Sequence, residues 1–298
     1  MGNYRFSVAT PMSFSLCFPD NEKSCFACCP PIRPAGYEHI HYRHMIMRIL
    51  RENSMDIHRR NKTLAPITGF SCWALGYVLG DYKVVGCLLH PAQNGGVDLR
   101  YRTGYGEKCR RETCQEERIF SLLQGFEKKF WLQLSAGLDS FAYSSREINP
   151  LFRMLGWGVN ILRLIAEREY LWTFSREDFF QSYPFFRTKL APRANAYLIS
   201  RIISLAGTHP LTRIDFTDMF NAFSTLIVKR LLGKYRSMPE GRYTHLLDID
   251  PLFSDFLRLS VGIVKTTLNY AIDMKDMVDE EVEGFMKQTA YVPKLLSR

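Results

Sequence analysis

The stretch Asp215–Gly233, DFTDMFNAFSTLIVKRLLG, has the clearest helical period in the chain. Its apolar residues recur every three or four positions, which places them on one face of an α-helix. The residues of this face are Phe216, Phe220, Phe223, Ile227 and Leu231. Asp215 or Thr217 is suited to begin the helix and Gly233 to end it. The pattern therefore predicts a well-buried helix and indicates a mainly α fold.

Four more stretches have a similar period. They are residues 36–53, 116–134, 150–173 and 193–206. The second of these is predicted to bury Ile119, Leu122, Leu123, Phe126 and Phe130. The third contains Gly156 and Gly158, where a break is expected. After these, Ser175 and Asp178 form a capping pattern for a short aromatic helix that ends before Pro184.

The last helical region begins with Asp250 followed by Pro251, a cap and first-turn signature. An apolar period continues from there to about Gln288, which exceeds an ordinary helix and predicts a break near Gly262 or Asp273. The residues predicted to face inward are Leu252, Phe256, Leu259, Ile263, Leu268, Ile272 and Met277.

The first third of the chain differs from the rest in its sequence pattern. Residues 72–89 are broken by Gly76, Gly80 and Gly86 and predict a hairpin of short strands. Residues 90–113 are dense in turn residues, which predicts a loop-rich lobe with little apolar area to bury. We therefore expect two parts, a cysteine-rich irregular lobe (1–115) packed on an α-helical domain (116–298).

Composition and charge narrow the class of protein. Apolar residues make up 46% of the chain and charged residues 23%, as in an ordinary globular protein. The net charge is +9, and no block of five like charges occurs. No apolar stretch is long enough to span a membrane, and no secretory h-region is found at the start. The sequence thus predicts a soluble, cytoplasmic protein without a membrane partner.

Cysteine is the most informative residue type. All eight cysteines lie between Cys17 and Cys114, and none follows. A core that used cysteine only as a small apolar residue would spread it along the chain. In a reducing compartment structural disulfides are disfavoured, so clustered cysteines indicate metal ligation or thiol redox chemistry.

The spacing of these residues resembles that of metal-binding turns. Cys25 and Cys28 form a C-x2-C turn, whose two thiolates can converge on one ion. Cys87 and His90 offer a second two-ligand turn, and the two turns would complete one tetrahedral site. The cysteines left for another site are Cys17, Cys29, Cys72, Cys109 and Cys114.

The adjacent pair Cys28–Cys29 adds a constraint. Neighbouring side chains on an extended backbone point to different sides, so both rarely bind the same mononuclear ion. The pair is easier to explain if each thiolate serves a different metal, or if the two flank a multinuclear cluster. Zinc and an iron–sulfur cluster both accept four thiolates, so the cofactor is predicted to be one of these two.

On these residues the chain resembles the bacterial cysteine-rich proteins described as zinc- or iron-chelating domains. The likeness covers about residues 17–114: Cys17, the Cys25–Cys29 element, Cys87 before His90-Pro91, and Cys109 to Cys114. The long gap from Cys29 to Cys72 and the helical C-terminal part depart from that group. The resemblance implies metal binding and implies no catalytic activity.

The leading hypothesis is a metal-binding protein with a structural, sensing or electron-transfer role. Its ligands are predicted to be Cys25, Cys28, Cys29, Cys72, Cys87, Cys109 and Cys114, with Cys17 and His90 in reserve. One alternative is a nucleic-acid-associated regulator that presents Arg100, Arg102, Arg110 and Arg111 to phosphates. Another is a thiol redox protein. Triad-like and H-E-x-x-H patterns are lacking, so no catalytic residue is predicted.

Overall fold

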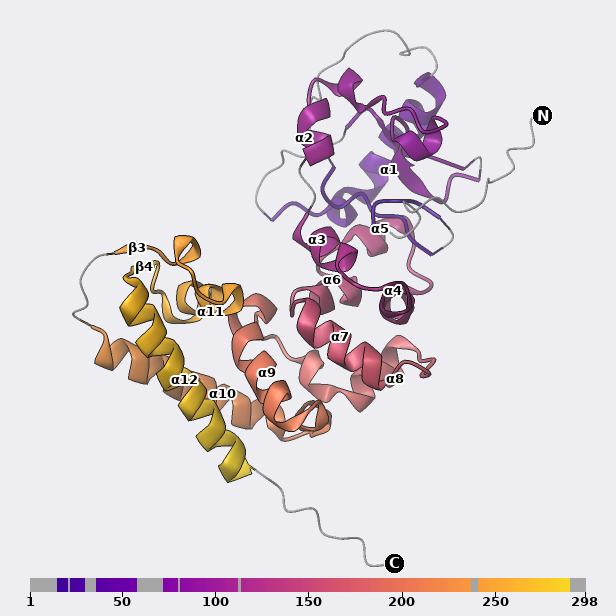
Figure 1. Ribbon diagram of the computed structural model, residues 1–298. Helices are drawn as coiled ribbons and strands as arrows, with labels where there is room; N and C mark the ends of the chain where they lie inside the picture. Colours follow the sequence, from indigo (N-terminus) through magenta and orange to yellow (C-terminus); the bar gives the residue numbers. More distant parts are fainter. Residues whose placement is uncertain are drawn as a thin grey trace, which may run out of the picture. The chain divides into compact units, whose positions relative to one another are not determined.

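The computed structural model describes residues 15–20, 22–29, 36–57, 72–79, 81–111, 114–236 and 241–289, with the backbone alone at positions 108, 110 and 111. The chain divides into two compact units, Met1–Leu155 and Gly156–Arg298. Helices predominate throughout these ranges and strands are very short (Figure 1). The predicted mainly α class is confirmed.

The first unit contains all of the cysteines. Its α-helices and strands are α1 (Arg43–Asp56), β1 (Leu75–Tyr77), β2 (Val85–Cys87), α2 (Gly106–Arg111), α3 (Gln115–Ser121), α4 (Gly125–Leu132), α5 (Ser140–Ser144) and α6 (Pro150–Leu155). Its 3-10 helices are η2 (His39–Tyr42), η3 (Pro91–Gln93), η4 (Arg100–Thr103) and η5 (Gln133–Ser135). The composition shift after residue 115 therefore falls inside this unit, and a domain boundary there stays a prediction.

The predicted hairpin is present in the first unit. Strands β1 and β2 pair antiparallel with Leu75 opposite Cys87 and Tyr77 opposite Val85. Helix α1 packs on β1, and Ile46 and Leu50 of that helix are fully buried. Around them lies an apolar core that includes Phe26, Trp73, Ala74, Leu75, Val85, Leu89 and Phe141. This small core supports the cysteine-bearing loops.

The second unit is built almost entirely of helices. They are α7 (Val159–Arg168), α8 (Arg176–Ser182), η6 (Pro184–Arg187), α9 (Pro192–Ala206), η7 (His209–Thr212), α10 (Phe216–Lys234), η8 (Thr244–Leu246), α11 (Pro251–Phe256), the π-helix η9 (Leu257–Val261) and α12 (Leu268–Thr289). Helix α9 packs against both α11 and α12, which follow it in the chain (Figure 1). Strands β3 (Arg242–Tyr243) and β4 (Lys265–Thr266) form a two-residue antiparallel pair.

Several helix predictions are confirmed. All five residues of the Phe216–Leu231 face are buried in α10. Ser175 caps α8, where its hydroxyl accepts a hydrogen bond from the backbone N–H of Asp178 at 3.2 Å. Asp250 caps α11 by accepting from the N–H of Leu252 at 2.7 Å. These are local capping patterns, which short stretches of sequence specify without help from tertiary structure.

Other helix predictions are wrong in extent. The stretch 116–134 is two helices, because Gln124 and Glu127 form a capping box that starts α4 anew at Gly125. Leu122 and Phe126 were expected inside but are exposed. The stretch 150–173 breaks at Gly156–Gly158 as expected, and α7 ends at Arg168. Each break restarts the helical phase, so an apolar face extrapolated across it no longer points inward.

The same error affects the last helical region. The break at Gly262 is confirmed, since this residue has a left-handed φ of 84°. The chain then passes through β4 before α12 begins at Leu268. Leu259, Leu268 and Ile272 are exposed, and α12 instead buries Ala271, Met274, Val278 and Val282. Within the described ranges, no helix combines the length and apolar character that a bilayer crossing requires.

Candidate metal centre

All eight cysteines lie among the described residues, and none of them is in a disulfide. Cys72 is buried and the other seven are half-buried. They come from six short segments of the first unit, so their arrangement depends on what holds each segment in place. Two groups emerge from these local structures.

A tight turn brings Cys17 and Cys25 toward each other. The backbone N–H of Asp20 donates to the carbonyl of Lys23 at 2.8 Å, which reverses the chain between the two cysteines. The Asp20 carboxylate accepts from the N–H of Glu22 and that of Lys23, each at 2.8 Å, and pairs with the Lys23 ammonium. Because Cys17 and Cys25 lie on the two arms that leave this turn, they approach one another.

Helix α5 fixes the loop that carries Cys25. The Ser24 hydroxyl lies 2.6 Å from that of Ser140, and the N–H of Phe26 donates to the Ser144 hydroxyl at 2.9 Å. Ser144 in turn donates to the carbonyl of Ser24 at 3.2 Å. Both neighbours of Cys25 are thereby held by a helix more than a hundred residues later in the chain.

Cys114 joins this group through the start of α3. Its sulfur accepts from the backbone N–H of Glu117 at 3.4 Å, as a helix N-cap does. The Glu117 carboxylate is buried and accepts from the N–H of Leu16 at 2.7 Å. Leu16 precedes Cys17, so Glu117 connects the Cys17 loop to the helix that Cys114 caps.

Burial and the neighbouring thiols affect the pKa values of these cysteines. Burial and the neighbouring thiols of Cys28 and Cys114 raise the pKa of Cys17. Burial, Cys17 and Cys28 likewise raise the pKa of Cys25. Burial raises the pKa of Cys114 to about 12, and Glu116 and Cys28 contribute to this rise. We call Cys17, Cys25, Cys28 and Cys114 the Cys17 set.

The β1–β2 hairpin positions two of the remaining cysteines. Cys72 lies just before β1 and Cys87 ends β2, opposite Leu75. The N–H of Leu88 donates to the carbonyl of Ala74 at 2.8 Å, so both cysteines lie at the same end of the hairpin. The N–H of Ala74 donates to the Cys72 sulfur at 3.4 Å. Burial raises the pKa of Cys87 to about 11, whereas hydrogen bonds from the N–H groups of Leu89 and His90 lower it.

Asn53 links this hairpin to α1. Its side-chain amide donates to the carbonyl of Cys72 at 3.2 Å and to that of Leu75 at 2.9 Å, and all three residues are buried. We expect Asn53→Ala to lower the free energy of unfolding by about 2 kcal/mol, because two buried carbonyls lose a donor. Urea unfolding would measure this. The exposed neighbour provides the control: Glu52→Ala should change stability by less than about 0.5 kcal/mol, and an equal loss in both variants would contradict the role of Asn53.

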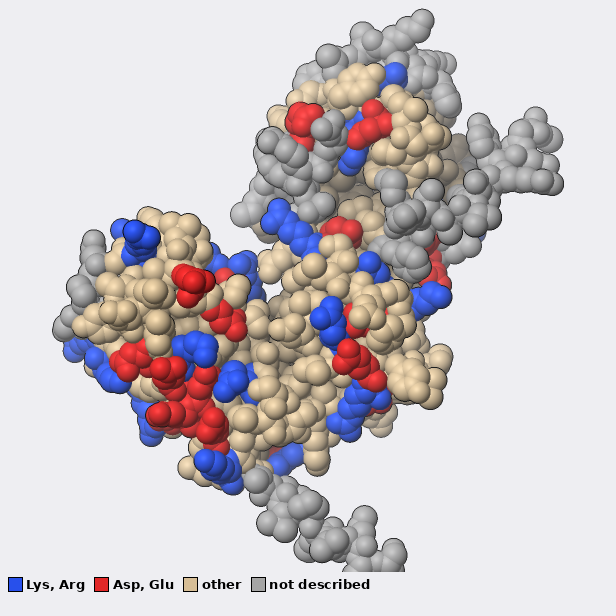
Figure 2. Space-filling model, viewed as in Figure 1, with Lys and Arg blue, Asp and Glu red and all other residues tan. Residues whose placement is uncertain are grey.

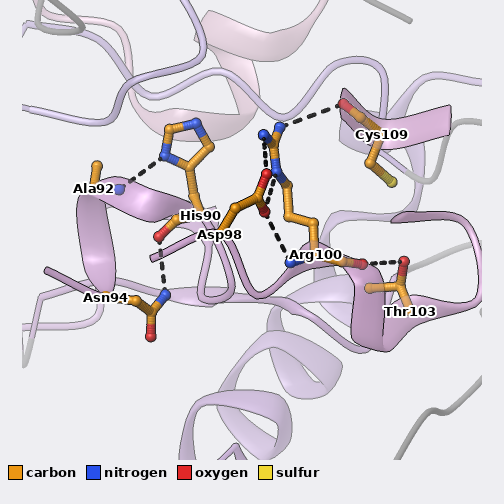
Figure 3. A network of polar contacts seen from close by, with 7 residues as sticks. All are labelled: His90, Ala92, Asn94, Asp98, Arg100, Thr103 and Cys109. Carbon is orange, nitrogen blue, oxygen red and sulfur yellow. Dashed lines mark hydrogen bonds and ion pairs between the residues drawn. The ribbon is translucent and has the colours of Figure 1, made fainter. Parts of the chain in front are cut away.

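Cys109 lies on α2, and Arg100 contacts its backbone carbonyl (Figure 3). The Arg100 guanidinium donates to both carboxylate oxygens of Asp98, at 2.9 and 2.8 Å, and to the carbonyl of Cys109 at 3.4 Å. The first residue of α2, Gly106, lies so close to η4 that a Cβ there would fall 2.3 Å from the Cα of Tyr101. Burial raises the pKa of Cys109, and a hydrogen bond to Thr103 and the charge of Arg100 lower it.

Cys29 completes the second group. It packs with Cys87 against the core that contains Cys72. A hydrogen bond with Cys28, burial, and the neighbouring thiols of Cys72 and Cys87 all raise its pKa. Burial raises the pKa of Cys72 to about 12, with further contributions from Cys87 and Cys109. We call Cys29, Cys72, Cys87 and Cys109 the Cys72 set.

The Cys28 thiol is a neighbour of Cys17, Cys25 and Cys114 and also of Cys29 and Cys109. A single site shared by the Cys25–Cys28 and Cys87–His90 turns stays a prediction. The Nδ1 atom of His90 accepts from the N–H of Ala92 at 3.2 Å as the cap of η3 (Figure 3), and burial and Arg100 lower its pKa. Within the described ranges, no three or more Cys, His, Asp or Glu side chains are placed as ligands of a single ion. The thiols are thus neighbours of one another, and Cys28 lies near members of both groups.

Asp139 holds α5, and through it the Cys25 loop. Its carboxylate accepts from the N–H groups of Phe141 and Ala142 at 2.9 and 3.0 Å and pairs with Arg43 at 2.9 Å. Burial opposes ionisation, but these contacts outweigh it and lower the pKa of Asp139 below 3.8.

We expect Asp139→Ala to cost about 1 kcal/mol at neutral pH, since it removes the cap. Asp139→Asn keeps a capping oxygen and should cost less. The carboxylate binds protons less readily in the folded than in the unfolded protein, so its stabilisation is present above the unfolded pKa. That stabilisation should disappear as the pH falls through the lowered folded pKa. Urea titrations across pH would check this: a wild-type advantage over Asp139→Asn that persists in acid would contradict the assignment.

The basic face expected on the metal lobe is partly described. Arg100 is paired with Asp98, and the Arg102 guanidinium lies 5.8 Å from the centre of the Tyr101 ring. The side chains of Arg110 and Arg111 lie outside the described residues. On the second unit, acidic side chains gather over α12, where six Asp and Glu lie between Asp273 and Glu283 (Figure 2). Three of these acidic residues are in ion pairs: Asp273 with Lys234, Asp279 with Arg201, and Glu281 with Arg230.

Comparison with known proteins finds no matching family model, no similar curated protein and no similar solved structure. The case for a function therefore rests on the residues of this chain alone.

Proposed function

We propose that this protein binds zinc or an iron–sulfur cluster through the clustered thiolates of its first unit. The observation that carries the proposal is that backbone N–H groups point at cysteine sulfurs in turns: Ala74 at Cys72, Leu89 and His90 at Cys87, and Glu117 at Cys114. Such donors stabilise the thiolate, which is the form that a metal binds.

The burial of these thiols beside one another supports the same function. Several of them are buried beside other thiols, and burial together with these neighbours raises the pKa of each, which favours the protonated thiol in the metal-free unit. A bound cation would replace those protons and neutralise the gathered thiolates. The hydrogen bonds to sulfur would then act on a charged acceptor, where they are about twice as strong.

The ligand chemistry favours a structural, sensing or electron-transfer role. A metal surrounded by four thiolates has no open position for water or substrate, unlike a catalytic zinc. When bound, zinc would supply a cross-link between distant segments, and a cluster would supply electron transfer as well. The residues of this chain hold the cysteine-bearing segments in place and direct N–H donors toward several of the sulfurs.

Elemental analysis of anaerobically purified full-length protein, together with its absorption spectrum, tests the proposal. Stoichiometric zinc in a colourless protein, or iron and sulfide with broad visible absorption, would support it. Absence of both metals, with the thiols oxidised in pairs, would overturn it in favour of a thiol redox protein. Salt-sensitive oligonucleotide binding by a metal-free protein would instead favour the nucleic-acid-associated regulator.

A further inference from the structure

We infer that a cavity in the first unit binds a small organic anion, one that joins an apolar body to a carboxylate or phosphate group. The cavity has a volume of about 830 Å³, which is within the range of sites for small organic ligands. Its walls come from the turn between Cys17 and Cys25, from α1, from the β1–β2 hairpin and from α4, η5 and α5. No cysteine is among the described residues that line it, so the inference does not rest on metal binding.

The first reason is a buried ammonium group on the cavity wall. The Lys23 side chain is only 4% exposed, and its Nζ atom pairs with the Asp20 carboxylate. An ammonium has three N–H donors, and no other described group accepts a hydrogen bond from this one. A buried ion pair recovers its cost of desolvation only when the remaining protons also find acceptors. An anionic oxygen of a ligand in the cavity would supply such an acceptor.

The second reason is a tyrosine hydroxyl on the same wall. Tyr77 is only 7% exposed, and its hydroxyl has no hydrogen-bond partner among the described residues. Its ring meets the edge of the Tyr82 ring, with the centres 5.5 Å apart. Tyr82 also lines the cavity and has a φ of 55°, which a bulky residue rarely adopts. Backbone strain of this kind is concentrated at binding sites, where the surrounding structure holds it.

The third reason is that donors on the wall outnumber the acceptors. The carboxylates of Asp20 and Asp139 already accept from backbone N–H groups and pair with Lys23 and Arg43. Their negative charges are therefore matched within the wall. What remains is the set of donors that lack a full complement of acceptors, and these suit a ligand with charged oxygens.

Two exposed lysines add to this excess of donors. Lys83 and Lys129 both line the cavity. The nearest oxygen of Asp81 lies 3.7 Å from the Lys83 ammonium, and Lys129 has no partner among the described residues. Against these two cations the wall has one exposed carboxylate that is not paired, that of Glu22. The balance favours an anion over a cation.

Apolar side chains indicate that the anion is organic. Met47, Leu132 and Phe141 line the cavity together with the polar groups. The Arg43 guanidinium lies 5.1 Å from the centre of the Phe141 ring, so charge and apolar surface are adjacent. A ring or hydrocarbon body would cover the apolar part of the wall, which an inorganic ion alone would leave in contact with water.

Calorimetric titration of the full-length protein with four probes tests the inference. Phenyl phosphate and benzoate each join a ring to an anion, benzyl alcohol has the ring alone, and inorganic phosphate has the anion alone. We expect at least one aromatic anion to bind about tenfold or more tightly than benzyl alcohol and inorganic phosphate. Tighter binding of phenyl phosphate would identify a phosphate ester as the ligand, and tighter binding of benzoate a carboxylate.

Variants locate the bound probe. Lys23→Met should weaken binding by about tenfold or more, because a charged donor is lost. Tyr77→Phe should weaken it by about two- to tenfold and leave the stability of the protein unchanged, because only an unpartnered hydroxyl is removed. This variant keeps the test decisive if Lys23→Met does not fold. Lys129→Met should also weaken binding, whereas Lys128→Met is the matched control, since Lys128 adjoins it on α4 without lining the cavity.

Three results would overturn the inference. The first is an absence of saturable binding by both aromatic anions at millimolar concentration. The second is equal affinity for benzyl alcohol, which would show that the anionic group makes no contribution. The third is binding that Tyr77→Phe and Lys129→Met leave unchanged, which would place the probe outside this cavity.

Discussion

Removal of the metal from the full-length protein is expected to unfold the first unit and leave the helices of the second unit folded. Within the first unit, the cysteine-bearing segments are held mainly by two three-residue strands and the small core around α1, which are too little to order all six of them. A structural four-thiolate zinc contributes about 10–16 kcal/mol of apparent binding free energy at neutral pH, and that energy is available for folding. The loss should therefore be large and cooperative.

Amide hydrogen exchange measured by mass spectrometry would resolve the effect along the chain. After treatment with a strong chelator, peptides that cover Cys25–Cys29 and the β1–β2 hairpin should lose protection. Peptides from α9 and α10 should exchange as before, which makes them an internal control. Retained protection around the hairpin in protein shown to be metal-free would mean that the core alone folds this unit.

The second large effect is expected from Phe185→Ala. Phe185 is fully buried in the second unit, and its ring centre lies 5.5 Å from those of Trp157, Phe186, Phe216 and Phe220. Removing the ring leaves a cavity among four aromatic side chains, which costs about 3–5 kcal/mol. Denaturant unfolding, followed by tryptophan fluorescence, would measure the loss.

The matched control is an exposed apolar residue of the same unit. Leu171 is 79% exposed, so Leu171→Ala should change stability by less than about 0.5 kcal/mol. Metal content should stay at the wild-type value in both variants, because all cysteines belong to the first unit. A loss below about 1 kcal/mol for Phe185→Ala would show that the surrounding rings close the cavity.

Local sequence predicted the helices best where one uninterrupted element carries the whole pattern. The Phe216–Leu231 face lies on a single helix, and all of it is buried. The predicted face from Leu252 to Met277 crosses a π-helix, Gly262 and a strand, and several of its members are exposed. A hydrophobic period keeps its phase only inside one helix, so breaks that long-range packing decides are the limit of this kind of prediction.

For the candidate site, spacing identified the cysteines, and the separation expected of Cys28 and Cys29 stays a prediction. It did not identify the residues that hold the segments together: Glu117 binds Leu16, Asn53 binds Cys72, and Ser144 binds Phe26. These partners are 19 to 118 positions apart in the chain. A single sequence contains no pattern that marks such pairs, because any buried serine, asparagine or glutamate can fill the role.

Gly106 has a consequence for how related chains should be compared. Because a methyl group at this position would collide with backbone atoms of η4, any other residue there would push α2 outward and carry Cys109 with it. A relative could retain all eight cysteines and still lose the position of Cys109 through a change at a residue without a side chain. Surveys that count cysteines would miss such a loss, and inspection of position 106 would reveal it.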